Sequence, residues 1–210
     1  MNKFAIGIAT INQKDLLVEA INKYLVDFPN IHIYIVDNGH QDIQYTDARI
    51  TIHISEKNLG VSDSWNLLCN YAFYSKNPVE NILILNDDIY LGKKEDEVLS
   101  VFEEFFDFYV SHASWCSFLL SKNTFEKTGE FDNQFFPAYF EDNDYHIRMK
   151  LLGMSYKVTE KLTPEIFRSS CTIKKDPSLN FNFDLNRQKY INKWGGIPGQ
   201  ETFKTPIFQK

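Results

Sequence analysis

Short apolar runs alternate with amphipathic segments along the first half of the chain. The apolar runs, rich in isoleucine, leucine and valine, have the length of buried strands, and the segments between them carry apolar residues at helical spacing. Strands are predicted at residues 3–10, 31–36, 49–54 and 82–85, with helices at 15–28, 61–74 and 95–110. Alternation of this kind is typical of an α/β fold with a mainly parallel central sheet flanked by helices.

The second half of the chain is more mixed. Strands are predicted at 114–120 and 156–159, and helices at 122–128, 141–152 and 184–194, around an aromatic-rich loop at 129–140. No internal repeat, low-complexity tract or linker divides the chain. We therefore predict that residues 1–210 form a single domain.

The composition indicates a folded, acidic protein. Hydrophobic residues make up 43% of the 210 residues and charged residues 24%, which excludes a mainly disordered chain. With a formal net charge of −6 the chain lacks the basic surface of a general nucleic-acid binder, so no nucleic-acid partner is expected. Aromatic residues reach 15%, which indicates a well-filled core and surfaces on which flat ligands could stack.

The cysteines and the apolar runs bear on the cellular compartment. Cys69, Cys116 and Cys171 are far apart and show neither zinc-site spacing nor a disulfide framework, so buried thiols in a reducing compartment are the simpler interpretation. No apolar stretch reaches the ~18 residues that span a bilayer. We expect a cytoplasmic protein without a transmembrane segment, for which peripheral membrane association stays open.

Polar clusters follow three of the predicted strands. They are Thr10-Ile11-Asn12, Asp37-Asn38-Gly39 and Asn86-Asp87-Asp88. Each cluster alone would be an ordinary turn, because Asn, Asp and Gly favour turns. In an open parallel sheet, however, ligands bind beyond the carboxyl ends of the strands. The three clusters are therefore expected to converge on one binding site.

Asp87 and Asp88 are candidate metal ligands. Adjacent carboxylates at the end of an apolar strand repel each other unless a cation lies beside them. Mn²⁺ or Mg²⁺, which bind one or two protein carboxylates together with substrate phosphates, would remove the repulsion. The alternative is an acidic turn in water. The preceding apolar strand ILIL favours the metal site.

A second acidic cluster, Glu141-Asp142-Asn143-Asp144, opens a predicted helix. Carboxylates are favourable at a helix N-terminus for structural reasons alone. The segment before this cluster is apolar, however, and apolar surroundings raise the pKa of a carboxyl toward a value useful for a general base. His146 follows Asp142 by one helical turn, and we interpret it as an ordinary half-buried histidine.

Other common chemistries find no support in the sequence. No persuasive nucleophilic triad is present, and the five histidines show no metal-site spacing. Glycine-rich phosphate loops of the GxGxxG and GxxxxGK[ST] types are absent too. A bound diphosphate would then have to be neutralised by a metal ion and basic side chains.

Five short motifs occur in a fixed order. They read IATIN (8–12), IVDNG (35–39), NLGVSDSWN (58–66), LNDD (85–88), and GEFD with FEDND (129–132 and 140–144) followed by Arg148. In this order the chain resembles the GT-A nucleotide-sugar glycosyltransferases, especially the inverting family-2 type. The resemblance implies one Rossmann-like GT-A domain. Its nucleotide-sugar-binding half would span about residues 1–92, and a smaller, mixed acceptor-side half with the C-terminal tail about residues 93–210.

The resemblance also implies roles for individual residues. Residues expected at the donor nucleotide are Thr10, Asn12, Asp37, Asn38, Asn58, Gly60, Trp65, Asn86 and Asp87. For Trp65 a core position is equally compatible with the pattern. Asp88, with Asp87 beside it, would bind a Mn²⁺ or Mg²⁺ cofactor, and Asp142 would be the general base that deprotonates the acceptor hydroxyl. Residues expected on the acceptor side are Trp115, Tyr139, Glu141 and Asp144.

Two regions depart from the family pattern. Asn86 stands at the first acidic position of the DxD-type metal motif, so the acidic character rests on the two aspartates that follow. Where many relatives carry a histidine, this chain has Arg168, which cannot bind a hard cation but can pair with a diphosphate. We expect Arg168 or Lys193 to neutralise the leaving group. The tail at 193–196 either closes over the site or simply ends a helix.

The resemblance implies a metal-dependent, inverting transfer of a sugar to a hydroxyl of a glycan or glycoconjugate acceptor. The donor would be a nucleoside-diphosphate sugar, expected to be UDP-linked. One alternative is a sugar nucleotidyltransferase, although the Asn12-Gln13-Lys14 turn lacks the glycine-rich loop of that class. The other alternative is a non-catalytic module that binds nucleotide sugars or carbohydrates. Activity with and without a divalent metal separates these possibilities.

Overall fold

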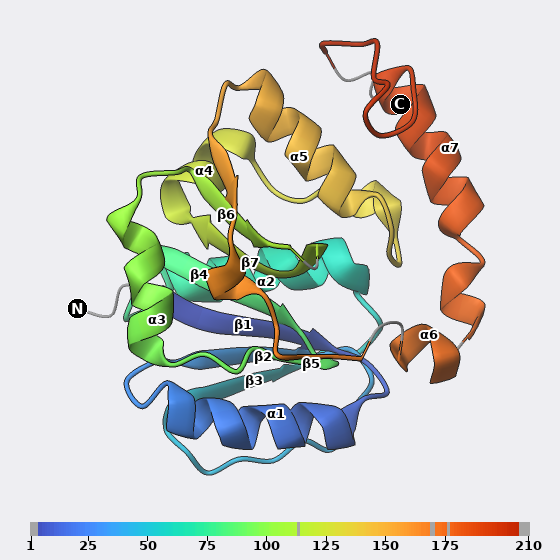
Figure 1. Cartoon of the computed structure of the whole chain (residues 1–210). Coiled ribbons are helices and arrows are strands. Elements are labelled where there is room, and N and C mark those ends of the chain that lie inside the picture. Colours follow the sequence, from blue (N-terminus) through green and yellow to red (C-terminus); the bar gives the residue numbers. More distant parts are fainter. Residues whose placement is uncertain (1–3, 113, 169–170, 176, 206–210) are drawn as a thin grey trace.

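The computed structural model describes residues 4–112, 114–168, 171–175 and 177–205. Lys3, which the predicted first strand includes, lies outside these residues. Within them a seven-stranded sheet has the order β3-β2-β1-β4-β7-β6-β8 (Figure 1). Its strands are β1 (Phe4–Thr10), β2 (Ile33–Asp37), β3 (Ile50–Ile54), β4 (Asn81–Asn86), β6 (Phe108–Ser111), β7 (Ser114–Ser121) and β8 (Tyr156–Val158).

The first four strands of the sheet are parallel. β3, β2, β1 and β4 run in one direction, whereas β7 is antiparallel to β4 and to β6, and β8 is parallel to β6. Thr10 at the end of β1 is in register with Asp37 on β2, and Ala9 is in register with Asn86 on β4. The three polar clusters therefore lie at one edge of the sheet, and the predicted α/β architecture is confirmed.

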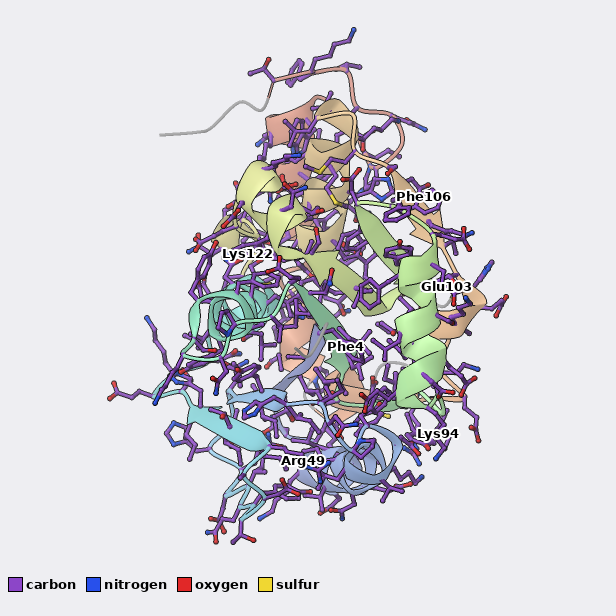
Figure 2. The ribbon with its side chains drawn as sticks, turned by 90° about the vertical axis from the view of Figure 1, so that its left-hand side faces the viewer. Phe4, Arg49, Lys94, Glu103, Phe106 and Lys122 are labelled. Carbon is purple, nitrogen blue, oxygen red and sulfur yellow. The ribbon has the colours of Figure 1, made fainter. Side chains whose placement is uncertain are left out.

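Helices cover both faces of the sheet. They are α1 (Lys14–Asp27), α2 (Gly60–Tyr74), α3 (Glu95–Leu99), α4 (Lys122–Thr128), α5 (Glu141–Leu151), α6 (Cys171–Lys175) and α7 (Phe183–Trp194). One buried cluster joins the sheet to α1 and α3, and a second joins its other face to α2, α4 and α5. In Figure 2, Phe4 marks the sheet between α2 and α3.

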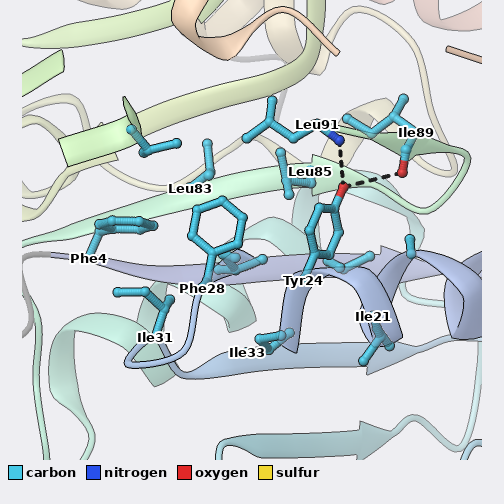
Figure 3. Packing of buried hydrophobic residues seen from close by; sticks show 14 of the residues in the cluster. Phe4, Ile21, Tyr24, Phe28, Ile31, Ile33, Leu83, Leu85, Ile89 and Leu91 are labelled. Atoms are coloured by element: carbon cyan, nitrogen blue, oxygen red, sulfur yellow. Dashed lines mark hydrogen bonds between the residues drawn. The ribbon is translucent and has the colours of Figure 1, made fainter. Parts of the chain in front are cut away.

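Tyr24 of α1 shows how the first cluster packs. Its ring is fully buried beside Phe28 of the same helix, and its hydroxyl donates to the Ile89 carbonyl at 3.3 Å (Figure 3). The same hydroxyl accepts a hydrogen bond from the Leu91 N–H at 3.2 Å. A buried hydroxyl needs such partners. These two hydrogen bonds connect α1 to residues 89–91, which follow β4 and Asp87.

The predicted helix over 95–110 is right at its start and wrong at its end. α3 ends at Leu99, a 3₁₀ turn follows (Ser100–Glu103), and residues Phe108–Ser111 form β6. Tyr109 is in register with Leu119 of β7 and with Lys157 of β8, so β6 lies between two partner strands. Aromatic and β-branched residues fill this strand, and pairing on both sides outweighs the helical spacing seen in the sequence.

A second, two-stranded sheet was not predicted. β5 (Ile89–Tyr90) pairs antiparallel with β9 (Ile166–Phe167), and the Arg168 N–H donates to the Asp88 carbonyl at 3.1 Å. This pairing brings a late segment of the chain beside the candidate metal ligands. After β9, α6 and α7 follow the outside of the molecule toward the C-terminus (Figure 1).

Two further predictions concern membrane spans and cysteines. In the part of the chain that the structure describes, every helix is too short or too polar to cross a bilayer. Cys69 and Cys116 are buried, as predicted, whereas Cys171 is half-buried.

Candidate functional site

A cavity of about 420 Å³ opens at the carboxyl ends of the parallel strands. It combines strand ends, the start of α2, the start of β7 and the segment that leads into α5. The predicted site residues that line it are Thr10, Asn38, Asn58, Gly60, Trp65, Asn86, Asp87, Asp88, Trp115, Tyr139, Glu141 and Asp142. The structure therefore brings together both acidic clusters, which are more than fifty positions apart in the sequence.

The loop after β2 connects the sheet to α2. The Asn38 side chain donates to the Ser64 hydroxyl at 2.8 Å and accepts from the Leu59 N–H at 3.1 Å. The Asp37 carboxylate accepts hydrogen bonds from the N–H groups of Gly39 at 2.9 Å and Gln41 at 2.7 Å. Asp37 is fully buried and does not line the cavity. Its contacts hold the loop in shape, and the nucleotide contact expected of Asp37 stays a prediction.

Gly60 lets the start of α2 approach the segment that leads into α5. Its φ of 73° lies in the left-handed region, and an added Cβ would come within 2.8 Å of the Pro137 carbonyl oxygen. The adjacent Val61 N–H donates to that same oxygen at 2.8 Å. A side chain at this position would separate the two segments, so glycine is required by the backbone conformation and by the close approach together.

Asp87 and Asp88 form the acidic floor of the cavity, and both are buried. Burial raises the pKa of Asp87 to about 7, while a hydrogen bond from Thr10 opposes the shift and the charge of Asp88 adds to it. The Ile11 N–H also donates to Asp87, at 3.3 Å. Burial likewise raises the pKa of Asp88. A nearby cation would favour the charged form of both carboxylates.

The donor set around these aspartates fits a hard cation whose coordination is completed by a substrate. Among the described residues, no group of three or more His, Cys, Asp and Glu side chains could hold a metal ion. Mg²⁺ and Mn²⁺ commonly bind one or two carboxylates and take their other ligands from phosphates and water. The Asp87–Asp88 pair provides the protein part of such a site.

Basic side chains lie near Asp88. The charges of Arg168 and Lys174 oppose the rise in its pKa, and the Cys171 N–H donates to its carboxylate at 3.4 Å. The guanidinium of Arg168 also lies 3.4 Å from a carboxylate oxygen of Glu19. Positively charged side chains therefore lie near Asp88, on the side of the cavity floor that faces β9 and α6. Arg168 itself follows the lining residue Phe167.

Glu141 and Asp142 also line the cavity, at the start of α5. They follow Tyr139 and Phe140, whose φ values of 77° and 75° are unusual for residues with side chains. Burial raises the pKa of Glu141 to about 8, and the charge of Asp142 adds to the shift. Burial also raises the pKa of Asp142, against a hydrogen bond from the Asn143 N–H. Local strain and raised carboxyl pKa values together are typical of functional sites.

The raised pKa of Glu141 gives a prediction for stability. A carboxyl whose pKa is higher in the folded than in the unfolded state contributes stability below its unfolded value near 4.5, and this contribution is lost as the pH rises through about 8. Glu141→Gln is therefore expected to have a higher Tm than the wild type at pH 8, with the difference shrinking toward pH 5. Each kcal/mol gained raises Tm by ~2–4 °C.

The matched control for this experiment is Glu103→Gln, because Glu103 is an exposed carboxylate outside the cavity. Its Tm should follow that of the wild type at every pH. Equal pH profiles for Glu141→Gln and the wild type, measured by thermal unfolding, would contradict the buried position of this carboxyl.

Aromatic side chains form the inner part of the cavity. Trp65 is almost fully buried and contacts the rings of Phe118 and Phe131 edge-on, with centroids 4.9 and 5.1 Å away. Trp115 stacks nearly parallel to it, with the ring centroids 6.4 Å apart, and is more exposed. Trp65 thus serves the core and the cavity wall together. Trp115 and Tyr139 offer ring surface to a ligand.

Five predicted site residues do not line the cavity: Asn12, Asp37, Asp144, Arg168 and Lys193. Lys193 corrects the expectation most strongly. Its buried ammonium lies between Asp132 at 2.6 Å and Asp144 at 2.5 Å, and is directed into the protein interior rather than toward a leaving group. Gly195, with a φ of 76°, ends α7, so the 193–196 tail has the helix-ending role that the sequence left as an alternative.

Sequence reasoning missed several lining residues. They are Ala9, Ile11, Val61, Leu85, Ser114, Cys116, Pro137, Ala138 and Phe167. The residues beside a recognised motif could have been inferred from their neighbours. Cys116 and Phe167 could not, because only the pairing of β7 with β4 and of β9 with β5 brings them to the cavity.

Comparisons with known proteins agree with this geometry at the level of the fold. No family model matches the sequence, and no curated protein does either. Among solved structures, the Pyrobaculum calidifontis mannosyltransferase in complex with GDP-Man and Mn²⁺ is similar with a TM-score of 0.62 and 11% identity. The catalytic domain of Drosophila β1,4-galactosyltransferase 7, in complex with xylobiose, is similar with a TM-score of 0.58 and 11% identity.

These alignments cover most of this chain. They include 80% of it for the mannosyltransferase and 83% for the galactosyltransferase. The chain spans 58% of the length of the first protein and 73% of the second. The fold is therefore that of the GT-A-type glycosyltransferases, as the motifs predicted.

Proposed function

We propose that this chain is a metal-dependent, inverting glycosyltransferase. It moves a sugar from a nucleoside-diphosphate donor to a hydroxyl of a glycan or glycoconjugate. The observation that supports this best is that one cavity is lined by both the aspartate pair and Asp142. Similar solved structures hold a nucleotide sugar with Mn²⁺ in one case and a saccharide in the other, which supports the same class of ligands.

The proposed chemistry is a single displacement. Asp142 accepts the proton of the acceptor hydroxyl, the acceptor oxygen forms a bond to the anomeric carbon, and the bond from that carbon to the diphosphate oxygen breaks. A carboxylate with a raised pKa is the stronger base, which suits Asp142 to this step. Asp88, assisted by Asp87, would hold Mn²⁺ or Mg²⁺, which offsets charge on the departing diphosphate when bound.

The nucleotide base of the donor and the cellular compartment are further parts of this proposal. A UDP-linked donor is the prediction of the sequence motifs, while one similar structure holds a guanosine nucleotide. Thr10 and Asn58 lie in the cavity, and we propose that they contact the nucleotide. Cytoplasmic location and a single domain over residues 1–210 stay predictions as well.

A thermal-shift panel tests the function. Wild-type protein is mixed with UDP, GDP and their sugar conjugates, with Mn²⁺ or with EDTA. A ligand at one hundred times its Kd stabilises the folded state by about 2.7 kcal/mol, which raises Tm by ~5–10 °C in a chain of this size. We expect such a rise for one nucleotide family, and only with metal present.

Turnover of the bound donor then separates the three classes of function. Release of nucleoside diphosphate together with a glycosylated acceptor supports the glycosyltransferase. Formation of a nucleotide sugar from a sugar phosphate and a nucleoside triphosphate identifies a nucleotidyltransferase instead. Binding without either reaction identifies a non-catalytic module.

A further inference from the structure

α7 contacts the segment between Asp132 and Asp144 along its whole length. This segment supplies Pro137, Ala138, Tyr139, Glu141 and Asp142 to the cavity wall. Rings of α7 and of the segment form one buried cluster with Ile147 of α5, and the rings are those of Phe135, Phe140, Tyr190 and Trp194. The helix is thus packed behind the wall that carries the candidate base.

Asn186 makes the central contact. Its side chain is fully buried, and its amide nitrogen lies 2.8 Å from the carbonyl oxygen of Phe135, 3.2 Å from that of Phe136 and 2.8 Å from that of Ala138. Its amide oxygen accepts from the Lys189 ammonium at 3.0 Å. One side chain therefore holds three backbone carbonyls, one at the end of the 3₁₀ turn Asn133–Phe135 and two in the irregular chain that follows. The amide has two N–H donors, so one of them is shared between two of these carbonyls.

Buried charged side chains hold the C-terminal end of the segment, at Asp144. The Trp194 indole N–H donates to a carboxylate oxygen of Asp144 at 2.9 Å, and Lys193 pairs with both Asp132 and Asp144. Arg148 adds a contact to the other oxygen of Asp144 at 2.9 Å. Because Asp144 lies two residues after Asp142, this cluster fixes the first turn of α5.

The backbone between these two attachments needs support. Tyr139 and Phe140 both have φ near 75°, a strained conformation for residues with side chains that persists only where the surroundings hold it. The ring of Phe183, at the start of α7, lies 5.1 Å from that of Tyr139 and 5.3 Å from that of Phe140. α7 therefore contacts the strained pair itself, as well as the backbone on either side.

We propose that Asn186 is a positioning residue of the acceptor side. It holds residues 135–138 from α7, and through them it sets the wall on which the acceptor lies and the placement of Glu141 and Asp142. The acceptor role rests on the proposed function. That Asn186 holds residues 135–138 in place does not depend on the proposed function, and it can be tested separately.

Amide hydrogen exchange tests the hold on the segment. In Asn186→Ala, peptides that cover residues 134–142 should exchange at least ~10-fold faster than in the wild type, because the loss of the buried amide frees three carbonyls. Peptides from β1 and β4 should keep their wild-type rates. Gln188→Ala is the matched control, since Gln188 is exposed on the same helix and its side chain bonds to Asn192, another residue of that helix.

A second variant keeps the test valid if Asn186→Ala fails to fold. Lys189→Met preserves the length of a half-buried side chain and removes its bonds to Asn186 and to the Gln134 carbonyl. We expect faster exchange of the same peptides, by ~3-fold. Wild-type exchange over 134–142 in whichever variant folds would overturn the proposal, whether or not the protein transfers sugar.

Kinetics test the acceptor role. In Asn186→Ala the KM for the acceptor should rise and kcat should fall, ~10-fold in their ratio, while the KM for the donor and metal-dependent donor binding stay at wild-type values. Equal losses on the donor and acceptor sides would point to general destabilisation and overturn the acceptor role. A wild-type protein that transfers no sugar to any acceptor contradicts the proposed function, and the exchange result still decides the hold on the segment.

Discussion

Asp142→Asn is expected to lower kcat for sugar transfer by ~10²–10⁴-fold, the range that loss of a general base produces. The amide has almost the same shape as the carboxylate, but it cannot accept the proton of the acceptor hydroxyl. Because Asp142 belongs to α5 whereas the aspartate pair follows β4, metal-dependent donor binding should be unchanged. Transfer rates under saturating donor and acceptor, together with donor affinity from calorimetry, measure both quantities.

The pH dependence of the wild type belongs to the same test. Burial raises the pKa of Asp142, so transfer should increase with pH as this carboxyl loses its proton. In Asp142→Asn that increase should disappear. Asp96→Asn, an exposed aspartate on α3, serves as the matched control and should retain wild-type kcat and pH profile. Near-normal transfer by Asp142→Asn would assign the base to another group.

Asp88→Asn is expected to lower transfer at a fixed, subsaturating Mn²⁺ concentration by ~100-fold or more. Removing a residue that hydrogen-bonds to a metal ligand already lowers metal affinity by ~10–100-fold. Removing the ligand itself should lower the affinity at least as much. Higher Mn²⁺ concentrations should restore part of the activity. Rates measured as a function of Mn²⁺ concentration separate weaker metal binding from a lower maximal rate.

Stability without metal separates this effect from misfolding. Asp88 is buried and its pKa is raised, so the neutral amide removes a costly charge. The metal-free Asp88→Asn protein should therefore have a Tm at pH 8 equal to or above that of the wild type, while its stabilisation by Mn²⁺ with donor is lost. Wild-type metal dependence in this variant would remove Asp88 from the proposed metal site.

Much of the site was predictable because its residues lie in short local motifs. The LNDD motif follows the apolar strand β4, and a strand end in a parallel sheet has a known position relative to its neighbours. The FEDND motif begins α5, where acidic residues are expected. Local sequence was therefore enough to identify Asp87, Asp88 and Asp142 as candidates. The cavity that joins them agrees with that prediction.

The failures come from residues whose surroundings are set by distant parts of the chain. Residues 108–111 have helical spacing, yet they form β6 because β7 and β8 offer pairing partners on both sides. Lys193 was predicted at a leaving group, yet Asp132 and Asp144 hold it in the interior. A side chain that can serve several purposes takes the one for which its three-dimensional neighbours provide partners.

The sequence by itself determined the α/β class, the order of the motifs that follow the parallel strands, and which acidic residues are candidates for the site. These depend on spacing and on neighbours along the chain. Only the tertiary structure decided that Gly60 lies against Pro137 in the cavity lining, and that Asn186 holds the backbone of residues 135–138. These contacts join residues separated by about fifty positions or more, so no local pattern could predict them. They exist because close packing and buried hydrogen bonding select one arrangement of the whole chain.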